Sequence, residues 1–380
     1  MTASSVPAAT SADVLVSFRG VKKTYDGEHL VVKQLDLDIR KGEFLTLLGP
    51  SGSGKTTCLM MLAGFEFPTG GEIRLDGQLL NRVPPHKRNI GMVFQNYALF
   101  PHMTVAQNVG YPLQVRGVPA AQRRQQIHEA LAMVHMESFA ARYPSQLSGG
   151  QQQRIALARA LVFKPQLVLM DEPLGALDKQ LREHMQIELK ALHQQLGMTF
   201  VYVTHDQNEA LTMSDRVAVF EQGVIQQLAP VDQLYEAPDN LFVAGFIGDS
   251  NRLSGQLRAG APDQAGQTAL CTLALPDGQA ILGQAIGKTA AGQEATASIR
   301  PERMRLLDPA EAAPAAGSLL RGRAAGLIYF GDHVRLQCEF AQQPHQCFVK
   351  VPLGTPALRH ITPGDAVTLA FEPEHLRVYA

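Results

Sequence analysis

A glycine-rich segment that ends in lysine and threonine has the residue types and spacing that point to the most specific chemistry. Residues 49–56 fit the pattern G-x-x-x-x-G-K-[ST], in which backbone N–H groups surround the phosphates of a nucleotide. Lys55 is expected to reach the β- and γ-phosphates, and the Thr56 hydroxyl is expected to bind Mg²⁺. The sequence therefore predicts a site for ATP with Mg²⁺. The residues expected to contact ATP here are Gly49, Pro50, Ser51, Gly52, Ser53, Gly54, Lys55, Thr56 and Thr57.

The elements that flank this segment are those that phosphate binding requires. Residues 44–48 predict a buried strand, and residues 56–62 predict a helix. The N-terminus of a helix presents unpaired N–H groups and the positive end of the helix dipole, which favour anions. Glycine permits backbone conformations that let successive N–H groups point inward. The order strand, loop, helix therefore favours a phosphate-binding site over a chance match.

A pair of carboxylates follows a second apolar stretch. Residues 167–170 predict a strand that ends at Asp171 and Glu172. If this strand is parallel to 44–48, both carboxylates reach the edge of the sheet where the phosphates bind. We expect Asp171 to bind Mg²⁺, directly or through water, and Glu172 to act on the attacking water as a general base or as an orienting group. The alternative is a surface Asp-Glu pair at the end of a strand.

A third motif lies between these two. Residues 147–151 read Leu-Ser-Gly-Gly-Gln and precede a helical pattern at 155–161. The motif and its spacing from the other two resemble the signature of the ATP-binding cassette (ABC) ATPases. A serine and two glycines at a helix N-terminus form a second anion site, which an ATP already held by its own loop cannot use. The resemblance implies two subunits that face head to tail, with each ATP between the phosphate loop of one subunit and the signature of the other. The signature residues that would contact ATP are Ser148, Gly149, Gly150 and Gln151. An ordinary turn and helix cap is the alternative.

The resemblance assigns roles to four further residues. Tyr25 resembles the aromatic residue that stacks on adenine, and Gln95 resembles the catalytic glutamine that contacts Mg²⁺ and water while sensing the membrane partner. His205 resembles the catalytic histidine at the γ-phosphate, and Asp178 lies in the loop that crosses the dimer interface. The alternatives are a tyrosine packed locally at a strand end, a solvated amide and a structural histidine.

Composition indicates a globular chain without a general attraction to polyanions. The 380 residues are 45% apolar, and 34 basic and 35 acidic residues give a net charge of −1. A nucleic-acid partner is therefore not expected. The four cysteines have no C-x-x-C spacing, so we expect reduced thiols rather than disulfides or zinc. No stretch approaches the ~20 apolar residues of a membrane-spanning helix.

The hydrophobic patterns predict an α/β P-loop cassette with an antiparallel β flank and a helical subdomain, followed by an all-β domain. We expect a mobile tail at 1–12, the cassette at 13–247 and its helical subdomain at about 96–160. The domain at 248–380 resembles the oligonucleotide-binding-like (TOBE) barrels of importer ATPases. Its halves, 250–310 and 318–380, could be repeats joined by an Ala-rich linker at 309–317.

The flank is expected at 13–19, 31–39 and 71–75, and the parallel strands at 43–48, 89–94, 166–171, 199–204 and 215–220. Helices are expected at 104–116, 121–136 and 139–146.

Taken together, the resemblance implies an ATP-hydrolysing subunit of an ABC importer. It would act as a homodimer on two integral-membrane permeases and indirectly with a substrate-binding protein, at the cytoplasmic face of the cell (inner) membrane as a peripheral subunit. Residues 97–103 would receive the permease or simply pack within the subdomain. The substrate resemblance is to spermidine/putrescine importers, with sugar, ferric iron and inorganic anions as alternatives. A soluble ABC ATPase unconnected to transport and a non-hydrolysing regulatory binder are the alternative classes.

Overall fold

The computed structural model describes residues 13–259, 270–287, 289–308 and 317–380. The predicted tail at 1–12 and nearly all of the predicted linker at 309–317 lie outside these ranges. The chain divides into two compact units, one that ends at Leu234 and one that begins at Tyr235. The predicted domain boundary, after Ile247, falls further along the chain.

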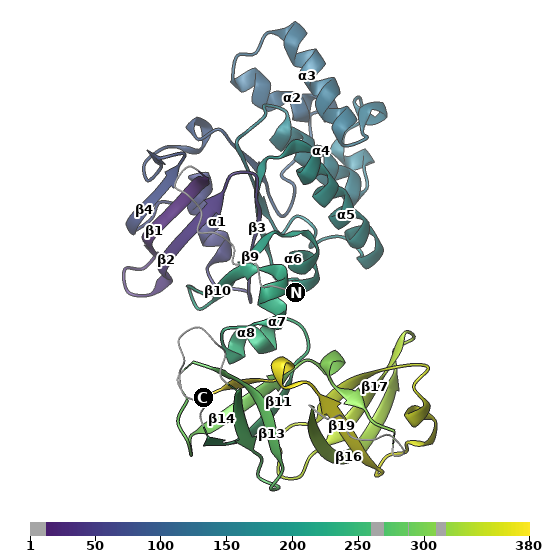
Figure 1. Ribbon diagram of the computed structural model, residues 1–380. Helices are drawn as coiled ribbons and strands as arrows, with labels where there is room; N and C mark the ends of the chain where they lie inside the picture. Colours follow the sequence, from purple (N-terminus) through teal and green to yellow (C-terminus); the bar gives the residue numbers. More distant parts are fainter. Residues whose placement is uncertain (1–12, 260–269, 288, 309–316) are drawn as a thin grey trace. The chain divides into compact units, whose positions relative to one another are not determined.

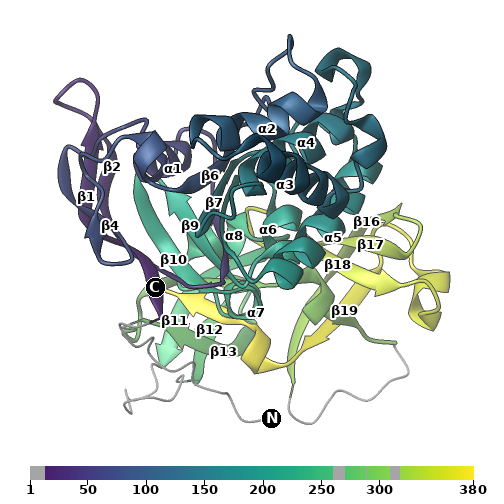
Figure 2. The same ribbon diagram turned by 90° about the horizontal axis from the view of Figure 1, so that it is seen from above.

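The first unit contains an antiparallel sheet in the order β2-β1-β4-β5. This sheet is the predicted flank, extended by one short strand. Its apolar side chains share a core with helix α1, which lies between this sheet and the parallel strands in both views (Figures 1 and 2). The strands are β1 (Val14–Thr24), β2 (Leu30–Arg40), β4 (Gly70–Leu75) and β5 (Gln78–Leu79).

The second sheet has the order β10-β9-β3-β8-β7-β6, and its strands are parallel except for β10. Every residue of β3, β7 and β8 is buried, as the continuous apolar runs predict for strands covered on both faces. The carboxyl ends of these strands bring the predicted catalytic residues to one edge. The strands are β3 (Phe44–Leu48), β6 (Ile90–Val93), β7 (Leu167–Asp171), β8 (Thr199–Thr204), β9 (Arg216–Glu221) and β10 (Val224–Pro230).

Helices α2, α3 and α4 lie together and form the predicted helical subdomain (Figure 1). The predicted helix at 139–146 is wrong, because two short 3-10 turns, Glu137–Phe139 and Pro144–Gln146, stand in its place. Pro144 forces the preceding Tyr143 into an extended conformation, which ends any helix there. The helices are α1 (Lys55–Ala63), α2 (Val105–Val115), α3 (Ala120–Met133), α4 (Gly149–Leu161), α5 (Lys179–Leu196), α6 (Gln207–Met213), α7 (Val231–Glu236) and α8 (Leu241–Phe246).

The second unit is all-β apart from α8 and short turns. Five strands form a closed barrel, β11-β12-β13-β20-β14, and five form a sheet, β15-β19-β16-β17-β18. The two predicted halves exchange strands: β20, at the end of the chain, closes the barrel, and β15 joins the other sheet. One apolar core therefore runs through both halves. The strands are β11 (Asn251–Ala259), β12 (Leu270–Ala274), β13 (Ala280–Ile286), β14 (Glu294–Ile299), β15 (Arg305–Leu306), β16 (Ser318–Tyr329), β17 (His333–Glu339), β18 (Cys347–Pro352), β19 (Ala366–Phe371) and β20 (Arg377–Tyr379).

Candidate ATP site

The phosphate loop connects β3 to α1 and is closely packed against its surroundings. A Cβ atom on Gly49 would lie 2.3 Å from the Phe220 carbonyl oxygen, so only glycine fits there. Gly54, at the N-cap of α1, has φ of 101° and would place a Cβ 2.9 Å from the Val31 carbonyl oxygen. A left-handed glycine with no room for a side chain lets the loop curl onto the helix N-terminus. The geometry has the features of an anion-binding loop.

Lys55 is 4% exposed, and its ammonium group lies inside the loop. The Nζ atom donates hydrogen bonds to the carbonyl oxygens of Gly49 and Pro50, each at 2.8 Å, and to Ser53 Oγ at 3.3 Å. Burial lowers the pKa of Lys55, and the carboxylates of Glu172 and Asp171 oppose that shift. The loop therefore holds one cationic group beside two acidic groups.

Thr56 and Asp171 meet at the start of α1 and the end of β7. Thr56 Oγ1 donates a hydrogen bond to Asp171 Oδ1 at 3.0 Å. Burial raises the pKa of Asp171, and the bond from Thr56 opposes this shift. Among the described residues, no group of three or more His, Cys, Asp or Glu side chains could hold a metal ion. Thr56 and Asp171 present oxygen atoms of a hydroxyl and a carboxylate, which suit Mg²⁺.

Two of the predicted catalytic side chains, Gln95 and His205, converge on the carboxylate of a third, Glu172. Gln95 Nε2 donates to Glu172 Oε2 at 3.2 Å, and His205 Nδ1 lies 3.1 Å from Glu172 Oε1. Glu172 has φ of 43°, a left-handed conformation that is uncommon outside glycine, and its N–H donates to the Val203 carbonyl at 3.0 Å. Backbone strain of this kind concentrates at functional sites. The ends of β6, β7 and β8 therefore place Gln95, Glu172 and His205 together.

A second polar network, which the sequence did not reveal, lies behind His205. Arg182 donates to the Leu177 carbonyl at 3.0 Å and to Asp206 Oδ2 at 3.3 Å. Glu209 is 2% exposed and accepts hydrogen bonds from Tyr202 at 2.8 Å and Thr204 at 2.6 Å.

Arg182 Nε lies 3.8 Å from Glu209 Oε1 and supplies the opposite charge. The network joins the loop before α5 to the loop that carries His205. Only a helical pattern with an arginine was visible in the sequence, so no signal distinguished Arg182 from a surface cation.

The signature lies at the start of α4 and has a different character. Ser148 Oγ accepts a hydrogen bond from the Gln151 N–H at 3.4 Å, and the Ser148 N–H donates to Gln151 Oε1 at 2.9 Å. This capping box satisfies the helix start. Ser148 and Gly149 are exposed, whereas a Cβ on Gly150 would lie 3.1 Å from Leu181 of α5. The helix cap that was the alternative interpretation is thus present, and Ser148 and Gly149 beside it remain exposed.

The two remaining predicted residues occupy exposed positions. Tyr25 is 60% exposed; its hydroxyl lies 3.5 Å from Thr57 Oγ1, and Lys23 Nζ lies 4.7 Å from the centre of its ring. The ring is therefore beside α1 and largely uncovered. Asp178 caps α5 by accepting a hydrogen bond from the Leu181 N–H at 2.9 Å.

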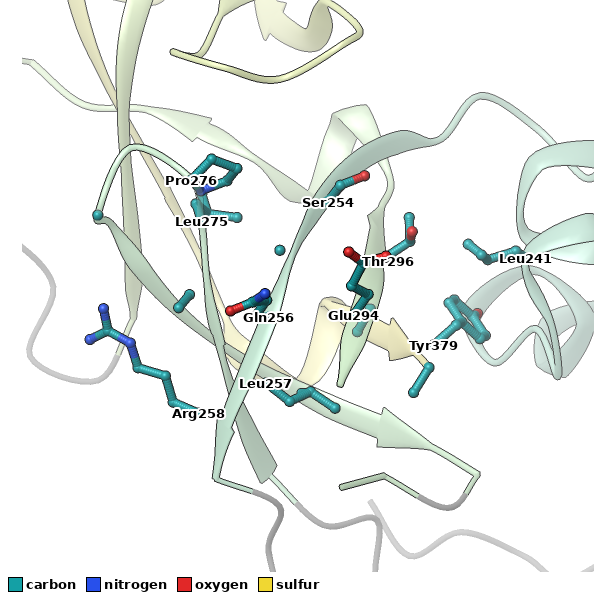
Figure 3. A pocket seen from close by; sticks show the side chains of 15 residues that line it. Leu241, Ser254, Gln256, Leu257, Arg258, Leu275, Pro276, Glu294, Thr296 and Tyr379 are labelled. Atoms are coloured by element: carbon teal, nitrogen blue, oxygen red, sulfur yellow. The ribbon is translucent and has the colours of Figure 1, made fainter. Parts of the chain in front are cut away.

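A cavity of about 890 Å³ in the second unit is separate from these residues. Figure 3 shows its lining side chains, among them Gln256 and Leu257 of β11, Glu294 and Thr296 of β14, and Tyr379 of β20. None of the predicted site residues lines it.

The fold and the phosphate-loop geometry define the class of the protein: a P-loop ATPase of the ATP-binding-cassette type. Comparison with known proteins agrees. The family described as "ABC transporter" matches residues 32–175, and the family described as "TOBE domain" matches residues 297–378.

The chain is 45% identical over 364 residues to the "Spermidine/putrescine import ATP-binding protein PotA" of Pseudomonas fluorescens, covering 94% of this chain and 95% of that protein. It is 43% identical to the protein of the same name from Rubrobacter xylanophilus, covering 95% and 93%.

Solved structures with the same fold include a dimeric post-hydrolysis state of the ATP-binding cassette MJ0796 bound to ADP and Pi. It has a TM-score of 0.52 and 37% identity, and the match covers 57% of this chain and 99% of that one. CbiO1 of Clostridium perfringens has a TM-score of 0.55 and 25% identity, and the match covers 58% and 90%.

The chain belongs to the family of ABC transporter ATP-binding proteins that carry a TOBE domain, and it is an ATPase. No helix among the described residues is long and apolar enough to cross a membrane.

Proposed function

We propose that the chain is the ATP-hydrolysing subunit of an importer for polyamines, the spermidine and putrescine named in its relatives. In this proposal two copies act on two integral-membrane permeases, and a substrate-binding protein is an indirect partner of the two copies. The subunit works at the cytoplasmic face of the cell membrane as a peripheral component.

The observation that carries the hydrolytic role is the position of Glu172. Its carboxylate accepts a hydrogen bond from Gln95, lies beside His205, and is close enough to Lys55 for their charges to interact. In the proposed reaction, Glu172 accepts a proton from water as the water oxygen attacks the γ-phosphorus in line. The bond from the γ-phosphorus to the β–γ bridging oxygen breaks, and the electron pair leaves with ADP.

Other groups of the chain hold the reactants. Lys55 and the loop N–H groups bind the β- and γ-phosphates, His205 contacts the γ-phosphate, and Gln95 orients the water. Mg²⁺ bound by Thr56, Asp171 and Gln95 would offset the phosphate charge. Tyr25 provides an exposed ring for the adenine.

The exposed signature supports a shared site. Ser148 and Gly149 are exposed at a helix N-terminus, so the ATP they would bind is held by the partner's phosphate loop. Closure of the two subunits around ATP and reopening after hydrolysis is then a two-state change that can drive the permeases. One solved relative is dimeric with ADP and Pi bound, which is consistent with this arrangement.

Reconstitution with the permeases and binding protein tests the proposal. ATP hydrolysis is measured with binding protein loaded with spermidine or putrescine, and in parallel with a sugar, ferric iron and an inorganic anion. The E172Q complex is the control for contaminating ATPases. We expect stimulation by the polyamines alone. Stimulation by another substrate class would contradict the assignment of polyamines as the substrate. Hydrolysis that none of the loaded binding proteins stimulates would contradict the importer role.

A further inference from the structure

A strained turn follows Gln95 directly in the sequence. Tyr97 has φ of 61° and Ala98 has φ of 46°. Two consecutive residues other than glycine in the left-handed region carry a steric cost that the surrounding structure has to offset. Hydrogen bonds inside the turn join the Tyr97 N–H to the Phe94 carbonyl at 2.9 Å and the Ala98 N–H to the Asn96 carbonyl at 2.7 Å.

The buried guanidinium group of Arg159 binds this turn. Arg159 of α4 is 9% exposed, and its two terminal nitrogens donate to the carbonyl oxygens of Tyr97 and Ala98, each at 2.7 Å. In this conformation the two carbonyls point to the same side, where the planar guanidinium can bind both at once. A lysine ammonium lacks that fork geometry.

Arg159 connects this turn with the signature helix and with a groove. It lies in α4, the helix that begins at the signature, and it lines a groove of about 420 Å³ with Phe100 and Tyr111. The Phe100 ring centre is 5.7 Å from its guanidinium carbon. A displacement of α4 therefore acts through Arg159 on the turn next to Gln95.

We propose that Arg159 is a positioning residue for ATP hydrolysis: its guanidinium holds the left-handed turn at Tyr97 and Ala98, and so fixes Gln95 against Glu172. This inference rests on the proposed role of Gln95 at the reacting water. Arg159 itself touches neither ATP nor the water in this account.

The main test compares kcat and KM for ATP in the full chain carrying R159Q. We expect kcat to fall at least ~10-fold, with KM changed less than ~3-fold, because the phosphate loop is untouched. If Arg159 acts through Gln95, then Q95A and Q95A/R159Q have the same kcat. Additive losses in the double variant, or an unchanged kcat in R159Q, overturn the proposal.

A rescue experiment separates positioning from ordinary core packing. Glycine accepts positive φ, so A98G in the R159Q background should restore kcat at least ~3-fold. The control is H135G, which relieves a left-handed residue with φ of 56° outside this turn and should restore nothing. Equal rescue by both substitutions, or by neither, contradicts the proposal.

If R159Q does not fold, R159K replaces it in the test, because lysine keeps the charge and most of the buried side chain. It should show the same fall in kcat, and wild-type kcat in a folded R159K overturns the proposal. Failure of the proposed hydrolytic role is distinguishable, since the wild-type chain would then hydrolyse no more ATP than E172Q.

Discussion

The two glycine-containing helix starts of the first unit differ in how complete they are. The phosphate loop is packed under neighbouring backbone, and its Lys55 is nearly fully buried within the chain's own atoms. The signature at Ser148 and Gly149 is exposed, and the Ser148 hydroxyl caps its own helix. The phosphate loop is thus enclosed by groups of its own chain, whereas the signature has an exposed face.

This difference indicates that the signature, rather than the phosphate loop, is the part that needs groups from a second subunit. A helix N-terminus binds anions whether or not its own chain supplies the rest of the site. The phosphate loop carries Lys55 and has Asp171 and Glu172 beside it. Among the described residues, the hydrogen bonds of Ser148 in the signature that involve a side chain are with Gln151, which is neutral. We therefore expect changes at Glu172 to affect chemistry, and changes at Ser148 to affect assembly.

The largest expected effect is that of E172Q. It should slow ATP hydrolysis at least ~100-fold, because the amide cannot accept the proton from water. ATP binding, measured by equilibrium titration, should stay within ~3-fold, since the phosphate loop is unchanged. Turnover close to wild type would show that Glu172 is not the base.

S148R tests the signature. A large cation on the open face should prevent closure on ATP and reduce hydrolysis at least ~10-fold, while each subunit still binds ATP through its own loop. ATP-dependent association is measured by analytical ultracentrifugation. S145R, at another exposed serine just before the signature, is the matched control. Unchanged ATP-driven association of S148R would count against the head-to-tail arrangement.

R182Q tests the network behind His205 through pH. Burial raises the folded-state pKa of Glu209 above its usual value of 4.5, with Tyr202, Thr204 and Asp206 also facing it and Arg182 opposing the shift. When the folded-state pKa of a carboxyl group is raised, the free energy of unfolding of the protein falls as pH rises through that pKa, because the fold disfavours the charged form. Without Arg182 this loss should grow.

We expect R182Q to lower the free energy of unfolding by ~1–3 kcal/mol at pH 8 and by less at pH 5, as measured in urea. R182Q/E209Q, which removes the unpaired carboxylate, should recover most of the pH 8 loss. An equal loss at both pH values would argue that Arg182 acts by packing alone.

The smallest effect is expected at Tyr25. Y25A should weaken ATP binding ~2- to 10-fold through loss of ring stacking. Y25F should bind as wild type does, because the ring is kept. Equal affinity of Y25A and wild type would favour the alternative that Tyr25 only packs locally.

The sequence predicted what continuous apolar runs and local motifs specify. Strands such as 44–48 and 167–170 are fully buried, so their patterns were unambiguous, and the residues that follow them had to meet at one edge. The convergence of Gln95, Glu172 and His205 follows from that rule.

Long-range polar contacts and strand exchange could not be predicted. Arg159 donates to carbonyl oxygens, and Arg182 to the Asp206 carboxylate, that are far away in sequence. A helical pattern in the sequence does not indicate such partners. The helix expected at 139–146 failed because Pro144 breaks it. The return of β20 to the barrel depends on pairing across the whole domain.

Cross-linking tests the central claim, that ATP is shared between the phosphate loop of one subunit and the signature of another. All four native cysteines are buried, so new exposed ones can be labelled selectively. Two pools of protein, both with the E172Q substitution, are prepared with different tags; one carries S51C and the other carries S148C. The pools are mixed and treated with a short bismaleimide, with and without ATP. We expect an ATP-dependent product that joins the two pools. Products that join only identical pools, or that form equally without ATP, would contradict it.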